Sequence, residues 1–399
     1  MNAPSSRYAY YRAALEGQHL PAAFVDLDVF DANLERLARR AGPLPIRLAS
    51  KSVRSVALMK RALARPPFLN GLLCYSAGEA AWLATQGFDD LVVAYPTVER
   101  DDLEAVARQI GEGRRITLMV DGAGQLDPID AAGAAAGVVM PVAIDLDLSS
   151  DFPGLHFGVY RSPVKDAESA LALAHAIARH KYLTLDGLMG YEGQIAGLAD
   201  AVPGQRLKNA IIRALKRRSI TEVRQRRTRV VAALRDAGFS LRFVNGGGTG
   251  SFETTRDEPS VTELAAGSGL YLPTLFDHYE VFRAEPAAGF ALPVVRLPGE
   301  GIATCSGGGY IASGPAGPSR LPQPWLPEGS SLFANEGTGE VQTPVRLPAD
   351  VKIGIGEPLF FRHAKAGELC ERFNELLLIQ AGRVVERVTT YRGDGKCFF

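Results

Sequence analysis

The sequence lacks several features that would assign the protein to a specialised class. It has 44 basic and 44 acidic residues, so its net charge at pH 7 is zero, which excludes a global attraction to nucleic acid or to an acidic membrane surface. The longest apolar run, residues 131–144, contains Pro141 and is shorter than the roughly 20 residues of a membrane-spanning helix. The first residues contain no apolar core of a signal peptide. We therefore expect no nucleic-acid partner and no membrane association.

Cysteine is also scarce. The four cysteines, Cys74, Cys305, Cys370 and Cys397, are widely spaced and form no CxxC pattern, which fits a reducing compartment. The composition is otherwise that of an ordinary globular protein, with 46% apolar and 22% charged residues. We expect a cytoplasmic enzyme or binding protein with two domains, because the chain has 399 residues and about 150 residues per domain is usual.

Short apolar runs alternate with amphipathic runs from residue 22 onward. Apolar runs are typical of buried parallel strands, and the amphipathic runs between them are typical of the helices that cover such strands. About eight such units over some 250 residues predict an α/β fold with a (β/α)8 TIM-like barrel, and a doubly wound open sheet is the alternative. The predicted strands are residues 22–28, 45–50, 71–76, 90–95, 116–121, 138–148, 182–190 and 241–248, and the predicted helices are residues 29–42, 55–65, 77–87, 98–111, 168–181 and 206–231.

The pattern changes after residue 275. Residues 293–332 are rich in Gly and Pro, and short strand-like runs follow without a long helix, which predicts a mostly β C-terminal domain. We expect an N-terminal extension at residues 1–21, a barrel at residues 22–275 and the β domain at residues 276–399.

The segment of residues 206–231 carries many cations and one acid, Glu222. Apolar residues recur within it at helical spacing, so we predict a long helix with a solvated basic face above an apolar one. The apolar residues expected beneath the charges are Leu207, Ile211, Ile212 and Leu215.

A lysine, Lys51, follows the second predicted strand. Lysine is usually a solvated surface charge, which is the simplest interpretation here. The carboxyl ends of barrel strands, however, are where barrel enzymes place their chemistry, and a partly desolvated lysine there is a nucleophile suited to a Schiff base.

A glycine-rich stretch, residues 246–250 (GGGTG), follows the last predicted strand. Such a loop exposes backbone N–H groups and suits a phosphate, although an isolated glycine-rich loop is as readily a tight turn. A reactive lysine near the start of a barrel and a phosphate loop near its end are the two features that pyridoxal phosphate requires.

His363 and Cys370 form a third candidate site, because imidazole and thiolate are zinc ligands. Two ligands do not complete a coordination shell. The alternative is a hydrogen-bonded histidine beside a buried cysteine.

The order of these features resembles the fold-type III pyridoxal phosphate enzymes, and specifically the D-threonine aldolase and D-serine dehydratase family, in which an alanine-racemase-like barrel precedes a β domain. Arg47 and Lys51 keep the spacing of the family's RPHxK segment. The resemblance covers roughly residues 20–395. It implies that Lys51 is catalytic and forms the Schiff base, and it implies a homodimer.

Further short motifs match the family. YEGQ at Tyr191 is similar to a YxGH segment, with Gln194 in place of the histidine, and ELAAGSGLY is similar to an ELxxGxY segment, which places Tyr271 and Asp277 near the cofactor phosphate. The cofactor-binding residues that the resemblance implies are Arg47, Lys51, Tyr191, Gln194, Gly246, Gly247, Gly248, Thr249, Gly250 and Tyr271.

The sequence departs from the family at two places. The histidine two residues before the lysine is Ala49 here, so we expect another catalytic base, His156 or Lys365. The family's metal pair, HxC or HxD, is represented by His363 and Cys370 with an insertion between them. The resemblance implies a divalent metal, zinc or manganese, on this pair, whereas Lys365, which takes the second ligand's place without a gap, would suit a metal-free site.

The function that the resemblance implies is a lyase acting on D-3-hydroxy amino acids. Retro-aldol cleavage to glycine and an aldehyde is placed ahead of dehydration to a keto acid and ammonia. An amino-acid racemase, a non-enzymatic cofactor carrier and a barrel with a sugar-phosphate site at GGGTG are the alternatives.

Overall fold

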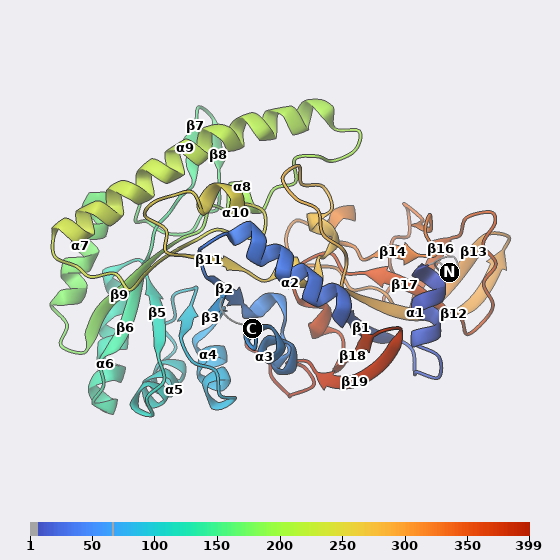
Figure 1. Cartoon of the computed structure of the whole chain (residues 1–399), viewed down its shortest axis with the longest axis horizontal. Helices are drawn as coiled ribbons and strands as arrows, with labels where there is room; N and C mark the ends of the chain where they lie inside the picture. Colours follow the sequence, from blue (N-terminus) through green and yellow to red (C-terminus); the bar gives the residue numbers. More distant parts are fainter. Residues whose placement is uncertain (1–6, 66–67) are drawn as a thin grey trace.

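The computed structural model describes residues 7–65 and 68–399. Eight parallel strands form a closed barrel in the order β10-β11-β2-β3-β4-β5-β6-β9 (Figure 1). The predicted (β/α)8 barrel is therefore confirmed. Its strands are β2 (Ile46–Ala49), β3 (Leu69–Cys74), β4 (Leu91–Val93), β5 (Ile116–Val120), β6 (Met140–Asp145), β9 (Leu183–Gly190), β10 (Phe243–Gly246) and β11 (Glu263–Ala266).

Helices cover the outside of the barrel (Figure 1). The ends of several are fixed by local chemistry: the Asp26 side chain accepts hydrogen bonds from the backbone N–H groups at the start of α2, and Ser76 does the same for α4, which stabilises each helix by about 1 kcal/mol. The longer helices are α2 (Leu27–Ala41), α3 (Val56–Leu63), α4 (Ala77–Thr85), α5 (Arg100–Gly111), α6 (Leu126–Ala136), α7 (Ala167–Ala178) and α9 (Arg206–Asp236).

The first predicted strand forms, but it does not belong to the barrel. Strand β1 (Ala22–Asp26) pairs with β12 (Ala288–Gly299) and β18 (Glu375–Gln380) in the second sheet, and β11 takes the eighth place in the barrel. All five residues of β1 are buried, so its apolar pattern suits a central strand of either sheet. Pairing partners far along the chain, which the pattern does not encode, decide between them.

The C-terminal part is mostly β, as predicted. Nine strands form its sheet, with β1 at the centre, and the helical segments described after residue 276 are short 3-10 turns, η4 (Pro318–Arg320) and η5 (Glu368–Glu371). The remaining strands of this sheet are β13 (Ile302–Ser306), β14 (Gln323–Leu326), β15 (Ser331–Leu332), β16 (Gln342–Arg346), β17 (Pro358–Arg362) and β19 (Arg383–Thr389). Helix α1 (Arg7–Ala14) lies beside this sheet, and its Tyr11 packs on Phe24 and Phe360 (Figure 1).

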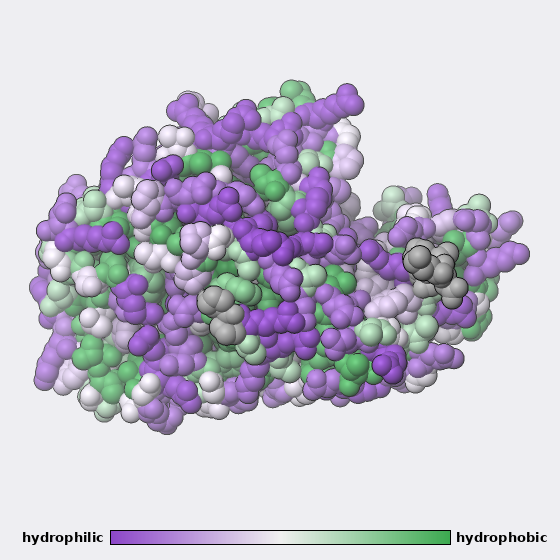
Figure 2. Space-filling view, viewed as in Figure 1, coloured by the Kyte–Doolittle hydropathy of each residue, from purple (hydrophilic) through white to green (hydrophobic). Residues whose placement is uncertain are grey.

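The long basic helix forms as predicted, but the prediction of which face is buried is wrong. Leu207 is 76% exposed and Ile211 is 52% exposed, because the N-terminal half of α9 runs past the barrel (Figure 1). The face that packs on the protein contains Lys216, Val223 and Arg227, among others. The surface over α9 is largely hydrophilic, with isolated apolar side chains (Figure 2).

No helix in residues 7–65 or 68–399 has the length and hydropathy needed to cross a membrane. All four cysteines are free thiols.

Candidate active site

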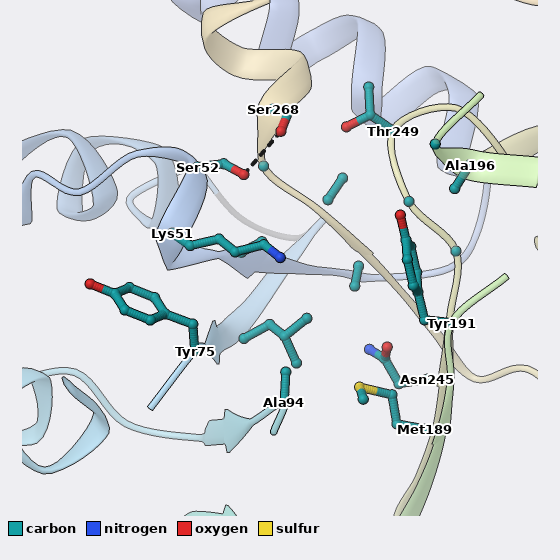
Figure 3. Close-up of a pocket in the computed structure, with 18 of the residues that line it drawn as sticks. Lys51, Ser52, Tyr75, Ala94, Met189, Tyr191, Ala196, Asn245, Thr249 and Ser268 are labelled. Carbon is teal, nitrogen blue, oxygen red and sulfur yellow. Dashed lines mark hydrogen bonds between the residues drawn. The ribbon is translucent and has the colours of Figure 1, made fainter. Parts of the chain in front are cut away.

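A cavity opens at the carboxyl ends of the barrel strands (Figure 3). Residues from six of the strand ends line it, and this is the position where barrel proteins place their sites. The polar and charged residues that line it include Lys51, Ser52, Tyr95, Arg161, Tyr191, Asn245, Thr249 and Ser268.

Lys51 enters this cavity from a 3-10 turn, η1 (Ser50–Ser52), that directly follows β2 (Figure 3). Its Nζ atom donates a hydrogen bond to the hydroxyl of Tyr95 at 3.0 Å. The turn is also held from the C-terminal domain, because the backbone N–H of Gly367 donates to the Lys51 carbonyl at 3.2 Å. The lysine amine is therefore presented to the cavity rather than to the outer surface.

The glycine-rich turn lines the opposite wall through Gly247, Gly248 and Thr249. A Cβ atom on Gly248 would lie 2.9 Å from the Cβ of Ala196, so a side chain would close the approach to the backbone. Within the described residues, the backbone N–H groups of Gly247 and Thr249 meet no protein acceptor. Ser268, at the start of α11 (Ser268–Tyr271), is a further cavity-lining residue. Free N–H groups on a glycine turn form an anion-binding concavity.

A buried ion-pair network holds this turn in place. Arg227, which is fully buried, donates to Glu192 at 2.9 Å and also binds Glu258. The other carboxylate oxygen of Glu192 accepts a hydrogen bond from Ser251 at 3.0 Å, and the Ser251 hydroxyl also lies 3.1 Å from the N–H of Gly248, which donates to it. Helix α9 therefore positions the turn through a chain of hydrogen bonds.

Replacing Gly250 by alanine is expected to weaken phosphate binding strongly. Its Cβ would lie 2.3 Å from the Ala196 carbonyl oxygen and 2.5 Å from a ring carbon of Tyr279, so the turn must move. We expect at least about a tenfold rise in the Kd for pyridoxal phosphate, the equivalent of about 1.4 kcal/mol. Gly124→Ala, where a Cβ meets open space, is the matched control. Equal Kd values for the two variants, measured by fluorescence titration, would contradict an anion-binding role for the glycine turn.

Arg161 packs over the ring of Tyr95, the residue that accepts the hydrogen bond from Lys51. Its guanidinium lies 4.7 Å from the ring centroid of Tyr95 and 5.8 Å from that of Tyr191, and it donates to Asp145 at 2.6 Å. Burial raises the pKa of Asp145 to about 6, although the pairing with Arg161 opposes this rise. Arg161 therefore gives the cavity a fixed positive charge beside two phenols.

Several residues expected at the site are not among those lining the cavity. Arg47 is fully buried and binds Glu263 and Asp90, so it braces β2 from within the barrel wall. The Tyr271 hydroxyl donates to the Val53 carbonyl at 2.9 Å. Gln194 donates to the Leu148 carbonyl, and Asp277 pairs with Arg362. Gly246 and Gly250 flank the turn but do not line the cavity.

The two residues expected to bind a metal have other partners. The Nε2 atom of His363 lies 2.7 Å from the Ala366 carbonyl, and the Cys370 thiol donates to the Val53 carbonyl at 3.3 Å. Burial lowers the pKa of His363 to about 4 and raises that of Cys370 to about 12. A cysteine binds a metal as its thiolate, and no group of three or more metal-ligating side chains occurs in the described ranges. The residues present therefore do not fit a divalent metal.

The two expected bases also lie away from the cavity lining. His156 is on a hairpin formed by β7 (Ser150–Phe152) and β8 (Leu155–Phe157), where it pairs with Asp151 at 2.7 Å. The Lys365 amine binds the hydroxyl of Ser313 at 2.7 Å and lines a neighbouring cavity.

Sequence reasoning missed Tyr95, Arg161 and Asn245. Tyr95 is the last residue of the predicted strand of residues 90–95, so the rule that singled out Lys51 at a strand's carboxyl end was sufficient to find it. Arg161 lies in a loop after the β7–β8 hairpin and carries no local pattern.

The fold and the cavity define a class, namely parallel-barrel proteins in which a lysine amine and a glycine-rich turn face one cavity at the carboxyl ends of the strands. The model of the family described as alanine racemase, N-terminal domain, matches residues 25–274. The chain belongs to this family.

Similar proteins extend this finding. A 3-hydroxy-D-aspartate aldolase from Paracoccus denitrificans (strain Pd 1222) is 24% identical over 254 residues, which are 63% of this chain and 60% of the relative, so the match spans less than two thirds of that protein. The crystal structure of D-threonine aldolase from Filomicrobium marinum has a TM-score of 0.80 at 23% identity and covers 96% of both chains. D-threo-3-hydroxyaspartate dehydratase from Delftia sp. HT23 has a TM-score of 0.76 at 20% identity, with 94% of this chain and 98% of that one covered. At these identities the two solved structures show the fold alone.

Proposed function

We propose that this protein is a pyridoxal phosphate-dependent lyase that cleaves D-3-hydroxy amino acids to glycine and an aldehyde. The observation that carries the proposal is the position of the Lys51 amine in the same cavity as the turn formed by Gly247, Gly248 and Thr249. The names of the aldolase relatives support the substrate class.

The residues around the cavity fit the cofactor. Lys51 supplies the amine that would hold its aldehyde carbon, and the free N–H groups of Gly247 and Thr249 would bind its phosphate. When bound, the cofactor supplies an electron sink for charge that develops at the α-carbon of the substrate. The walls formed by Ala94 and Met189 are apolar (Figure 3), so they exclude water and strengthen the interactions of the charged groups inside.

The proposal assigns no step to a metal, because His363 and Cys370 bind protein carbonyl groups. The charged side chains at the cavity are Lys51 and Arg161. Because Lys51 would hold the cofactor, Arg161 orients the substrate carboxylate in this proposal. A cytoplasmic location and a homodimer remain part of the proposal, and the four free thiols fit the former.

Dehydration to a keto acid and ammonia is the second candidate, and the dehydratase fold neighbour favours it. The two reactions differ in the bond that breaks, which is the bond between the α- and β-carbons in aldol cleavage and the bond between the β-carbon and the hydroxyl oxygen in dehydration. Aldol cleavage needs a proton acceptor at the substrate hydroxyl, whereas dehydration needs removal of the α-proton and departure of the hydroxyl group.

The experiment that tests the proposal is a product assay. The purified protein, loaded with pyridoxal phosphate, is incubated with D-threonine, D-serine or 3-hydroxy-D-aspartate, and glycine, aldehyde, keto acid and ammonia are measured. We expect equimolar glycine and aldehyde, with no turnover of L-threonine. Keto acid and ammonia alone would establish the dehydratase, and L-to-D conversion without cleavage would establish a racemase. No product from any of these substrates would overturn the proposal.

A further inference from the structure

The hydroxyl of Tyr95 accepts a hydrogen bond from the reactive amine of Lys51. Tyr95 follows strand β4 and lies 3.0 Å from Nζ, lines the cavity and is 37% exposed. Ala49, two residues before Lys51, offers no side-chain base. The residue that takes up a proton at the substrate hydroxyl must therefore come from another strand end.

We propose that Tyr95 is a catalytic residue that accepts the proton of the substrate's 3-hydroxyl group during aldol cleavage. This inference rests on the proposed function. In a 3-hydroxy amino acid the hydroxyl oxygen is attached two carbons from the amino nitrogen. Because the substrate amine reacts where the Lys51 amine reacts, an oxygen 3.0 Å from Nζ is within hydrogen-bond reach of that hydroxyl, the geometry that a general base requires.

The other titratable side chains that line the cavity are poorer proton acceptors. Burial raises the pKa of Tyr191 to about 12 and that of Tyr75 above its usual value, and it raises the pKa of the Cys74 thiol as well. Tyr95 behaves in the opposite way. Burial raises its pKa, but the Lys51 ammonium and the Arg161 guanidinium outweigh that effect, so the pKa of Tyr95 lies below its ordinary value of 10.0.

The charges that face Tyr95 come from several elements. Lys51 approaches from η1, Arg161 from the loop after β8, and Asp145 from the end of β6 raises the pKa of the phenol. Tyr191, after β9, and Lys365, after β17, also interact with it electrostatically. The two cations Lys51 and Arg161 together outweigh Asp145 and burial, so the pKa of the Tyr95 phenol is lowered.

In the cleavage step the O–H bond of the 3-hydroxyl breaks and an O–H bond forms on the Tyr95 phenolate. The carbon–oxygen double bond of the aldehyde forms as the bond between the α- and β-carbons breaks, and the cofactor, when bound, would supply the sink for the electron pair left on the α-carbon. A proton from solvent then adds at the α-carbon to give glycine, and Tyr95 returns its proton to solvent, so no net proton is consumed.

The test uses Tyr95→Phe, which removes only the hydroxyl oxygen and keeps the ring under Arg161. We expect kcat for aldol cleavage to fall by about 10²–10⁴-fold with little change in KM. We also expect the rise of wild-type kcat with pH, through a pKa below 10, to disappear. Tyr160→Phe is the matched control, because Tyr160 is 90% exposed and is not among the residues that line the cavity, and it should leave kcat and its pH profile unchanged.

A second readout needs no turnover. In the cofactor-free protein, tyrosinate absorbance is titrated, and we expect one phenol to ionise below the others in the wild type and in Tyr160→Phe but not in Tyr95→Phe. Borohydride trapping of pyridoxal phosphate on Lys51, located by mass spectrometry, separates the two claims. No adduct and no turnover in the wild type would overturn the proposed function and this inference together. Adduct and turnover in both proteins, with an unchanged kcat and pH profile in Tyr95→Phe, would overturn the inference alone.

Discussion

Lys51→Ala is expected to remove both the absorbance band of the proposed cofactor and the proposed lyase activity. The amine is the nucleophile that the cavity presents, and loss of a covalent nucleophile costs on the order of 10⁶-fold in turnover in other enzymes. The measurement is an absorbance spectrum of protein purified with pyridoxal phosphate, before and after borohydride reduction, together with the product assay.

The fold is expected to survive this substitution. Lys51 is only partly buried and its side chain has one hydrogen bond, to Tyr95, so the melting temperature should stay close to that of the wild type. Lys60→Ala, an exposed lysine on the next helix, is the control and should retain the band and the activity. A persistent band in Lys51→Ala would show that another amine holds the cofactor.

Arg227→Met is expected to destabilise the protein by about 3–5 kcal/mol, because removal of one partner of a buried ion pair leaves uncompensated charge. Here two carboxylates, Glu192 and Glu258, lose the same fully buried guanidinium. Urea denaturation followed by circular dichroism measures the loss. Arg229→Met, two residues along the same helix, removes an exposed side chain bonded to Gln225, and its effect should stay within about 0.5 kcal/mol.

The loss in Arg227→Met should depend on pH. Burial already raises the pKa of Glu258 in the folded protein, although the pairing with Arg227 opposes this, and removal of the guanidinium raises it further. A carboxyl group whose folded pKa exceeds its unfolded pKa contributes stability that is present below the unfolded pKa and is lost as the pH rises through the folded pKa. The loss of unfolding free energy relative to the wild type should therefore shrink toward acid pH. A loss that stays constant with pH would contradict the inference that it arises from uncompensated charge on Glu258.

The sequence predicted the barrel because apolar strands and amphipathic helices repeat at a regular spacing. It failed for β1, because burial on both faces looks the same in a barrel strand and in a central sheet strand. It also failed for the buried face of α9. Helical periodicity locates a stripe of apolar residues along the helix, whereas Arg227 is buried because it pairs with Glu192 and Glu258. Those two partners come from distant loops.

Local motifs placed Lys51 and the glycine turn, since both follow strands directly. Residues whose roles depend on tertiary contact were beyond such reasoning. His363 and Cys370 are close in sequence, yet each binds a different backbone carbonyl, and Arg161 reaches Tyr95 across the barrel mouth. The partners of a side chain, rather than its type, separate a ligand from a structural residue.

The central position of β1 has a consequence for biosynthesis. The strand at residues 22–26 leaves the ribosome before the barrel strands, while its neighbours β12 and β18 lie after them in the chain. The barrel, by contrast, is complete once residue 266 has emerged. During translation the nascent barrel is therefore able to close before the second sheet, and β1 stays without its strand partners until β12 and β18 have emerged.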